Sequence, residues 1–170
     1  MVKKTHQVRR TLLIVGEGDS EEAFLKHVRE LICSGGAGVA ATIRNAHGKG
    51  PEHVIAHTVR QAVIYSYDRR VAFLDTDIPW TDKLQKNARK WKIDMVGSSP
   101  CLEGLLLAVL GHRVPEQSSD CKRLIQQTIR LDLTERKSYA VHFSLPVLVT
   151  ARQTIPELHR LLQFFEGRWP

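Results

Sequence analysis

Acidic residues follow two short apolar segments that the sequence predicts as buried strands. Glu17 comes just after the apolar run at 12–15, and Asp75 and Asp77 come just after the run at 71–74. Residues two apart in an extended chain lie on the same side, so Asp75 and Asp77 converge. Ligands of a parallel sheet bind beyond the carboxyl ends of its strands. We therefore expect these three carboxylates to meet at one edge of the sheet.

A divalent cation explains why carboxylates gather, because like charges need a cation or a proton to coexist. Glu21 falls in the first turn of the following helix and is a fourth candidate ligand. Oxygen ligands without His or Cys select Mg²⁺ or Mn²⁺ over zinc, and such an ion can bridge to a phosphodiester. The alternative is that Asp75 and Asp77 form a helix cap and a solvated turn, and that Glu21 only favours its helix N-terminus.

Two other phosphate-binding motifs are excluded by the residues present. The segment at 16–21, GEGDSE, begins like the dinucleotide motif GxGxxG, but Glu21 replaces the third glycine. Glu17 and Asp19 would also point negative charge at a pyrophosphate. No GK[ST] follows a glycine-rich turn, so a Walker loop is absent.

Apolar runs and helical patterns alternate along the chain and predict the fold class. Runs typical of buried strands lie at 12–15, 39–43, 71–74 and 93–97. Helical stripes separate or follow them, from a possible cap at Ser20 to 32, and at 51–62, 80–91 and 102–110. This order predicts an α/β, Rossmann-like fold with a mostly parallel four-stranded sheet and helices on both faces.

The C-terminal part carries weaker signals. Segments 121–131 and 156–165 read as helices, whereas 139–149 alternates weakly and contains Pro146, which predicts an edge strand or an irregular segment. We expect a basic N-terminal arm at 1–10, a core at 11–112, and a C-terminal helical extension at 113–170 packed on that core.

Composition limits the class of protein. The chain has 170 residues and a formal net charge of +7, which favours a polyanionic partner, nucleic acid first, over a merely solvated basic surface. No apolar run approaches the roughly 18 residues of a membrane span, and no signal-peptide pattern follows the N-terminus, so we expect a cytoplasmic protein without membrane contact. Three single cysteines without a CxxC pair argue against a disulfide framework and a zinc site.

Further polar residues accompany the predicted sheet edge. His47, Lys49 and His53 flank the glycine loop after the second strand and either contact phosphate or form a solvated turn. Trp80 either stacks on a base or, by its spacing with Leu84, packs in the core.

Three motifs in order resemble the TOPRIM domain, which primases, topoisomerases and OLD-type nucleases share. They are Glu17-Gly18-x-x-Glu21, Asp75-Thr76-Asp77, and Ser98-Ser99-Pro100-Cys101-Leu102-Glu103. The last is similar to the SNPCFE-type segment of the RloB-like branch, which is associated with bacterial restriction and defence loci. The resemblance covers about residues 11–112, and it implies a Mg²⁺- or Mn²⁺-dependent nuclease.

The resemblance also implies roles for single residues. Glu17 would be a metal ligand or general acid/base, Asp75 and Asp77 metal ligands, and Glu21 an auxiliary ligand, while Glu103 matches the acid of the RloB-like segment. OLD-type nucleases use a C-terminal lysine, for which Lys122 and Lys137 are candidates. TOPRIM nucleases often work as homodimers.

The chain departs from the RloB-like pattern at three positions. Ser99 stands in place of Asn, Leu102 in place of Phe, and Gly104 in place of a bulky aromatic residue. The leading hypothesis is a TOPRIM-type nuclease that hydrolyses DNA or RNA in a bacterial defence or restriction system. The alternative is a non-catalytic nucleic-acid-binding or regulatory subunit of a defence complex, and phosphoryl transfer on small molecules is a third class.

Overall fold

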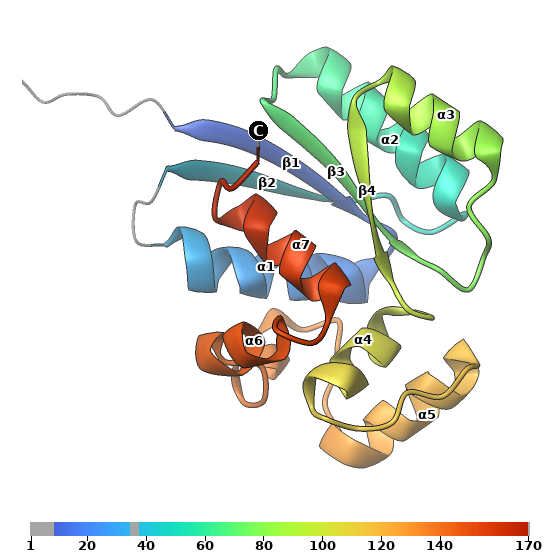
Figure 1. The fold of residues 1–170 in the computed structure, drawn as a ribbon, viewed down its shortest axis with the longest axis vertical. Coiled ribbons are helices and arrows are strands. Elements are labelled where there is room, and N and C mark those ends of the chain that lie inside the picture. Colours follow the sequence, from blue (N-terminus) through green and yellow to red (C-terminus); the bar gives the residue numbers. More distant parts are fainter. Residues whose placement is uncertain (1–8, 35–37, 170) are drawn as a thin grey trace, which may run out of the picture.

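A computed structural model describes residues 9–34 and 38–169, which form an α/β fold around a parallel four-stranded sheet (Figure 1). In chain order the strands β1 to β4 are Arg10–Gly16, Val39–Asn45, Arg69–Asp75 and Ile93–Ser98. Their order across the sheet is β2-β1-β3-β4, and every neighbouring pair is parallel. The predicted Rossmann-like parallel fold is therefore confirmed, and the carboxyl ends of all four strands share one edge.

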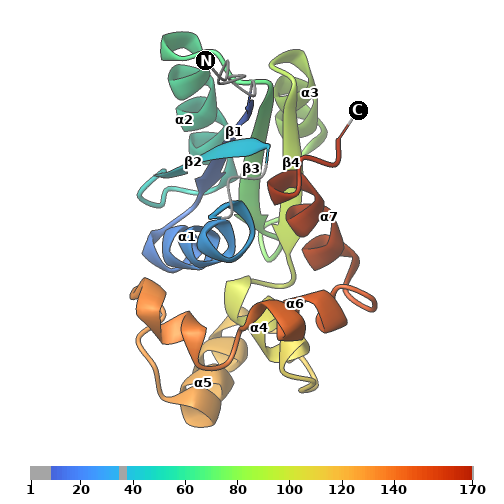
Figure 2. The same cartoon turned by 90° about the vertical axis from the view of Figure 1, so that its left-hand side faces the viewer.

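Helices cover both faces of this sheet, as predicted. The first four are α1 Asp19–Cys33, α2 Pro51–Ile64, α3 Asp82–Lys90 and α4 Leu102–Val109. The C-terminal elements are α5 Ser118–Ile129, the 3₁₀ helix η1 Arg136–Ala140, α6 Leu145–Ala151 and α7 Pro156–Phe165. Helices α2 and α3 lie on one face and α1 and α7 on the other, while α4, α5 and α6 gather beyond one end of the sheet in both views (Figures 1 and 2).

The apolar runs of the strands supply two cores, one on each face. In β1, Leu12 and Ile14 join the core under α1, whereas Leu13 and Val15 join the core under α2. Successive side chains of a strand point to opposite faces, so a strand covered on both sides reads as an unbroken apolar run. The core under α1 also takes in residues of α4 to α7, so the C-terminal extension packs on the sheet domain.

The strand predicted within 139–149 is wrong, because this segment forms η1 and α6. Its buried side chains Tyr139, Phe143 and Leu148 recur every four or five residues, which is a helical spacing rather than an alternating one. Pro146 lies in the first turn of α6, where a missing N–H costs no hydrogen bond.

Two helix starts also differ from the sequence analysis. Helix α1 begins at Asp19 with Gly18 as its N-cap, so the predicted cap at Ser20 is wrong. Helix α3 is shorter than predicted because the Thr81 hydroxyl accepts a hydrogen bond from the Leu84 N–H (3.1 Å) and begins the helix after Trp80.

The first residues of the chain test the boundary predicted between the basic N-terminal arm and the core. Arg10, assigned to the basic arm, is the first residue of β1, and residues 1–8 of that arm lie outside the described residues. No described helix has the length and apolar character that a membrane crossing requires.

Candidate functional site

The register of β1 and β3 brings Glu17 beside Asp75. Gly16, the last residue of β1, pairs with Phe73 in β3, so Glu17 leaves the sheet level with Leu74. The Glu17 carboxylate also interacts with the backbone of Asp75 and of Gly50, and both interactions lower its pKa. Two acids that are 58 positions apart in the sequence (75 − 17) therefore meet at the carboxyl edge.

Asp75 is held in place by the neighbouring strand and by the helix that follows it. It is the last residue of β3 and pairs in register with Ser98 of β4. Its Oδ1 accepts hydrogen bonds from the Ser98 hydroxyl (2.8 Å) and from the Leu102 N–H at the start of α4 (3.1 Å). The orientation of this carboxylate is thus fixed by the segment after β4.

The segment 98–101 also holds the loop that carries Asp77. The Asp77 N–H donates to the Pro100 carbonyl (2.9 Å), and the Thr76 and Ser99 hydroxyls are hydrogen-bonded (2.8 Å). The second and third motifs of the sequence analysis are therefore in direct contact. The Asp77 carboxylate is exposed and accepts a hydrogen bond from the Ser118 hydroxyl of α5 (2.7 Å).

Close packing explains the glycine that departs from the RloB-like pattern. A Cβ at Gly104 would lie 2.6 Å from the Ser99 carbonyl oxygen and 2.6 Å from Pro100 Cδ. Real Cβ atoms do not approach backbone this closely, so in this chain α4 packs against its own leading segment only with glycine at 104.

Glu21 combines a capping role with proximity to the acids. Its Oε2 accepts a hydrogen bond from the N–H of Gly18, the N-cap of α1 (3.0 Å), as in a capping box. The side chain is buried, with 9% of its surface exposed, and its charge raises the pKa of Asp75. The contact supports the interpretation of Glu21 as a residue that stabilises its helix N-terminus, while its role as an auxiliary metal ligand stays a prediction.

Burial and neighbouring acids raise the pKa values of Asp75, Glu17 and Glu21. Burial and the charges of Glu21, Glu17 and Asp77 raise the pKa of Asp75 to about 7, while the hydrogen bond from Ser98 opposes this rise. Burial and the charge of Asp77 raise the pKa of Glu17. Desolvation and like charge both disfavour the ionised form of a carboxyl group, so ionising several of these acids together costs free energy.

Two further residues border the group. The charge of Glu103, in the first turn of α4, raises the pKa of Glu21, which places this predicted residue beside Glu21. The charge of Lys122, an exposed residue of α5, lowers the pKa of Glu17. Lys122 therefore brings positive charge to the acids from the C-terminal extension, whereas Lys137 lies in η1, which packs against α1.

A basic cluster of Arg44, His47, His53, His57 and Arg60 adjoins the acids on the β2 side. After burial, the charges of the other four members lower the pKa of His57. The loop of this cluster is tied to the acid loop, because the Gly48 N–H donates to the Glu17 carbonyl (2.7 Å).

The sequence analysis predicted some of the basic residues in this region and missed others. His47 and Lys49 are exposed and adopt positive φ angles of 60° and 73°, so both predicted residues lie in a tight turn. Arg44, His57 and Arg60 were missed. The i, i+4 spacing of His53 and His57 on α2 is the signal that identifies His57.

The carboxylates as arranged do not form a preformed metal cage. Within residues 9–34 and 38–169, no group of three or more His, Cys, Asp or Glu side chains is positioned to hold a metal ion. Asp75 Oδ1 and Asp77 Oδ2 are engaged by Ser98, Leu102 and Ser118. The site is thus a set of neighbouring, mutually repelling acids with free oxygens on Asp75 and Asp77.

Comparisons of the chain with protein-family models, with curated proteins and with solved structures found no match.

Proposed function

We propose that this chain is a TOPRIM-type nuclease of the RloB-like branch, which hydrolyses nucleic-acid phosphodiester bonds with Mg²⁺ or Mn²⁺ in a bacterial defence or restriction system. The observation that carries the proposal is the meeting of Glu17 with Asp75 and Asp77 at the carboxyl edge of a parallel sheet. This is where ligands of such sheets bind.

The donor set fits a hard divalent cation. Its members are carboxylates, and their mutual repulsion is relieved when a cation binds between them. Glu17, Asp75 and Asp77 would hold the ion, with Glu21 and Glu103 behind them. When bound, the ion supplies Lewis-acid activation of a water molecule and of the phosphate.

The chain's own groups account for the remaining parts of hydrolysis. Glu17 has a raised pKa, which suits its alternative role as the group that accepts the proton of the attacking water. Lys122 contributes positive charge beside Glu17 and faces the negative phosphate. His47, Lys49 and His53, together with the basic cluster, grip the strand next to the cleaved bond.

A nuclease panel with matched variants tests the proposal. Wild-type protein, Glu17→Gln and Asp75→Asn are incubated with single- and double-stranded DNA and RNA in Mg²⁺, Mn²⁺ or EDTA. We expect cleavage by the wild type in metal only, and at least about a 100-fold lower rate in both variants. Glu116→Gln, an exposed acid outside the group, is the control. Equal rates in all four proteins would remove the proposed site.

A second candidate function is a non-catalytic nucleic-acid-binding or regulatory subunit of a defence complex. The observation that favours it is the absence of a metal-holding group among the described side chains. Calorimetric titration with Mn²⁺ separates the two functions. Saturable binding that Asp75→Asn abolishes supports the nuclease, whereas nucleic-acid binding without any Mn²⁺ binding supports the second candidate.

A further inference from the structure

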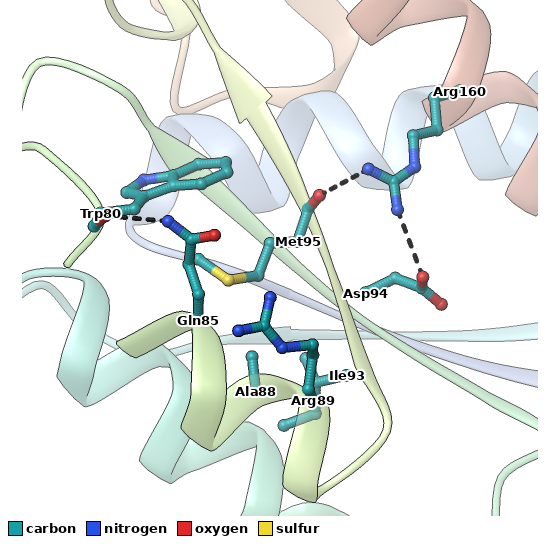
Figure 3. A pocket seen from close by; sticks show the side chains of 8 residues that line it. All are labelled: Trp80, Gln85, Ala88, Arg89, Ile93, Asp94, Met95 and Arg160. Atoms are coloured by element: carbon teal, nitrogen blue, oxygen red, sulfur yellow. Dashed lines mark hydrogen bonds and ion pairs between the residues drawn. The ribbon is translucent and has the colours of Figure 1, made fainter. Parts of the chain in front are cut away.

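Two adjoining hollows lie beside β4, the edge strand of the sheet. The first has a volume of about 270 Å³ and is lined by Trp80, Gln85, Ala88, Arg89, Ile93, Asp94, Met95 and Arg160 (Figure 3). The second has a volume of about 340 Å³ and is lined by Arg69, Asp94, Arg160, Gln163, Phe164, Arg168 and Trp169. Because they share Asp94 and Arg160, they form one groove between α3 and α7, which we name the β4 groove.

The β4 groove is strongly basic. Four arginines, Arg69, Arg89, Arg160 and Arg168, line it against one acid. That acid, Asp94, accepts from Arg160 Nη2 (3.2 Å) and lies 3.7 Å from Arg69 Nη1. The guanidinium of Arg89 has no hydrogen-bond or ion-pair partner within the described part of the chain, and Figure 3 shows it reaching toward Met95 inside the hollow. The groove therefore carries uncompensated positive charge.

At one end of the groove, Trp80 contacts the backbone of Asp75, one of the acids at the carboxyl edge. Trp80 lines the first hollow, and its indole N–H donates to the Asp75 carbonyl (3.1 Å). From there the groove follows β4 toward its amino end, where Trp169 lines the second hollow. Three residues of β4, Ile93, Asp94 and Met95, line the two hollows, and three strand residues span roughly 10 Å.

We propose that the β4 groove binds a single strand of nucleic acid and leads it to or from the acidic group. This inference rests on the proposed function for the chemistry of its ligand. The arginines contact consecutive phosphates, and the half-buried faces of Trp80 and Met95 contact a base.

The shape of the groove favours a single strand over a duplex. A duplex is a stiff, wide rod that touches only the rims of so small a hollow, whereas a single strand places one phosphate or base in each hollow. Positively charged grooves with aromatic contacts are typical of single-strand binding.

Binding measured without metal tests this proposal separately from catalysis. Fluorescence anisotropy in EDTA is recorded with a labelled 12-mer of single-stranded DNA or RNA and with the matched duplex. We expect tighter binding of the single strand, and a loss of at least about fivefold for Arg89→Glu. Arg89→Gln lowers the slope of log affinity against log salt by about 0.7, the value for one phosphate contact on a single strand.

Lys86→Glu is the matched control, because Lys86 lies on the same helix, is exposed, carries the same charge and does not line the groove. Equal losses for Lys86→Glu and Arg89→Glu overturn the proposal, as does binding of the duplex or of inorganic polyphosphate at least as tightly as the single strand. Circular dichroism checks that both variants are folded.

Crosslinking on the wild type supplies a test that needs no variant. A 4-thiouridine 12-mer is irradiated with the protein and the crosslinked peptides are mapped by mass spectrometry. Crosslinks in 80–95 or 160–169 support the proposal, and crosslinks confined to other segments overturn it. If Asp75→Asn abolishes cleavage but not this binding, both proposals are supported. If the wild type binds the single strand but never cleaves it, the binding proposal is supported and the nuclease proposal is wrong.

Discussion

The molecule treats its buried carboxylates in two different ways. Near the C-terminus, the Arg152 guanidinium, only 8% exposed, donates to both oxygens of Glu166, from Nη1 to Oε1 at 2.5 Å and from Nη2 to Oε2 at 3.2 Å. At the carboxyl edge of the sheet, the charges nearest to Asp75 are those of other acids, and Glu21 has the largest effect. One buried charge is therefore neutralised by the fold, and the other is not.

This difference supports the proposal that the acidic group binds a cation, whereas the Arg152–Glu166 pair serves the fold. A buried ion pair with bidentate geometry satisfies both partners and orients the segments that carry them. A buried group of like charges destabilises the fold when it ionises, so the proposed cation would relieve this repulsion on binding. The proposed metal therefore takes, at Asp75, the place that Arg152 takes at Glu166.

Breaking the neutralised pair should have the largest effect on stability. Arg152→Met leaves Glu166 partly buried beside an apolar side chain, so we expect a loss of about 3 kcal/mol in the free energy of unfolding, measured by urea denaturation. Glu166→Gln added to Arg152→Met should recover part of this loss, because the exposed Arg168, whose Nε lies 3.5 Å from Glu166 Oε2, compensates that charge only in part. Arg123→Ala, which breaks the exposed pair with Asp120, should cost less than about 0.5 kcal/mol.

Adding a divalent cation that binds the acidic group should have the next largest effect. An ion that binds the folded protein at 100 times its dissociation constant stabilises it by about 2.7 kcal/mol. We expect Mn²⁺ to raise the melting temperature more at pH 8 than at pH 5.5, because the pKa of Asp75 is raised to about 7 and protonation competes with the metal. The same rise in Asp75→Asn would show that the ion binds elsewhere.

The fold follows from the sequence because its strands are short apolar runs buried on both faces. Leu12 to Val15 reads as such a run, and alternate residues supply the two cores. The region around Tyr139 was predicted wrongly because η1 and α6 are short and each buries a single residue, Tyr139 and Leu148, so neither element shows a period by itself. Long-range packing against α1, rather than local pattern, determines this region.

The candidate site was predictable only in part, for a geometric reason. Glu17 and Asp75 could be predicted from their positions at strand ends, because parallel strands place their carboxyl ends together. The hydrogen bonds of Ser98 to Asp75 and of Ser118 to Asp77 depend on how α4 and α5 pack beyond the sheet, and no local spacing encodes that. The β4 groove was missed for the same reason, since Arg89 and Arg160 lie on helices far apart in the sequence.

Raising the pH in the absence of metal should change the free energy of unfolding by a smaller amount than the two changes above. The pKa of Asp75 rises from 3.8 to about 7 on folding, so the folded state binds more protons, and this carboxyl's contribution to stability is lost as pH rises from about 4 to 7. Since the side chain is partly exposed, we expect a loss of about 2 kcal/mol rather than the full value of the shift. Urea denaturation in EDTA at pH 4.5 and pH 8 should show a larger loss in the wild type than in Asp75→Asn, in which the raised pKa values of Glu17 and Glu21 still act.

The smallest effect should come from Lys122, the one cation that lowers the pKa of Glu17 among the causes identified there. Lys122 is exposed, so solvent screens its charge and Lys122→Met should change the free energy of unfolding by less than about 0.5 kcal/mol. The pKa of Glu17, followed by NMR titration of its carboxyl carbon, should nevertheless rise in this variant, while Lys137→Met leaves it unchanged. A rise of equal size in both variants would mean that overall charge, not the position of Lys122, acts on Glu17, and the acidic group would then lack even this partial counterpart to Arg152.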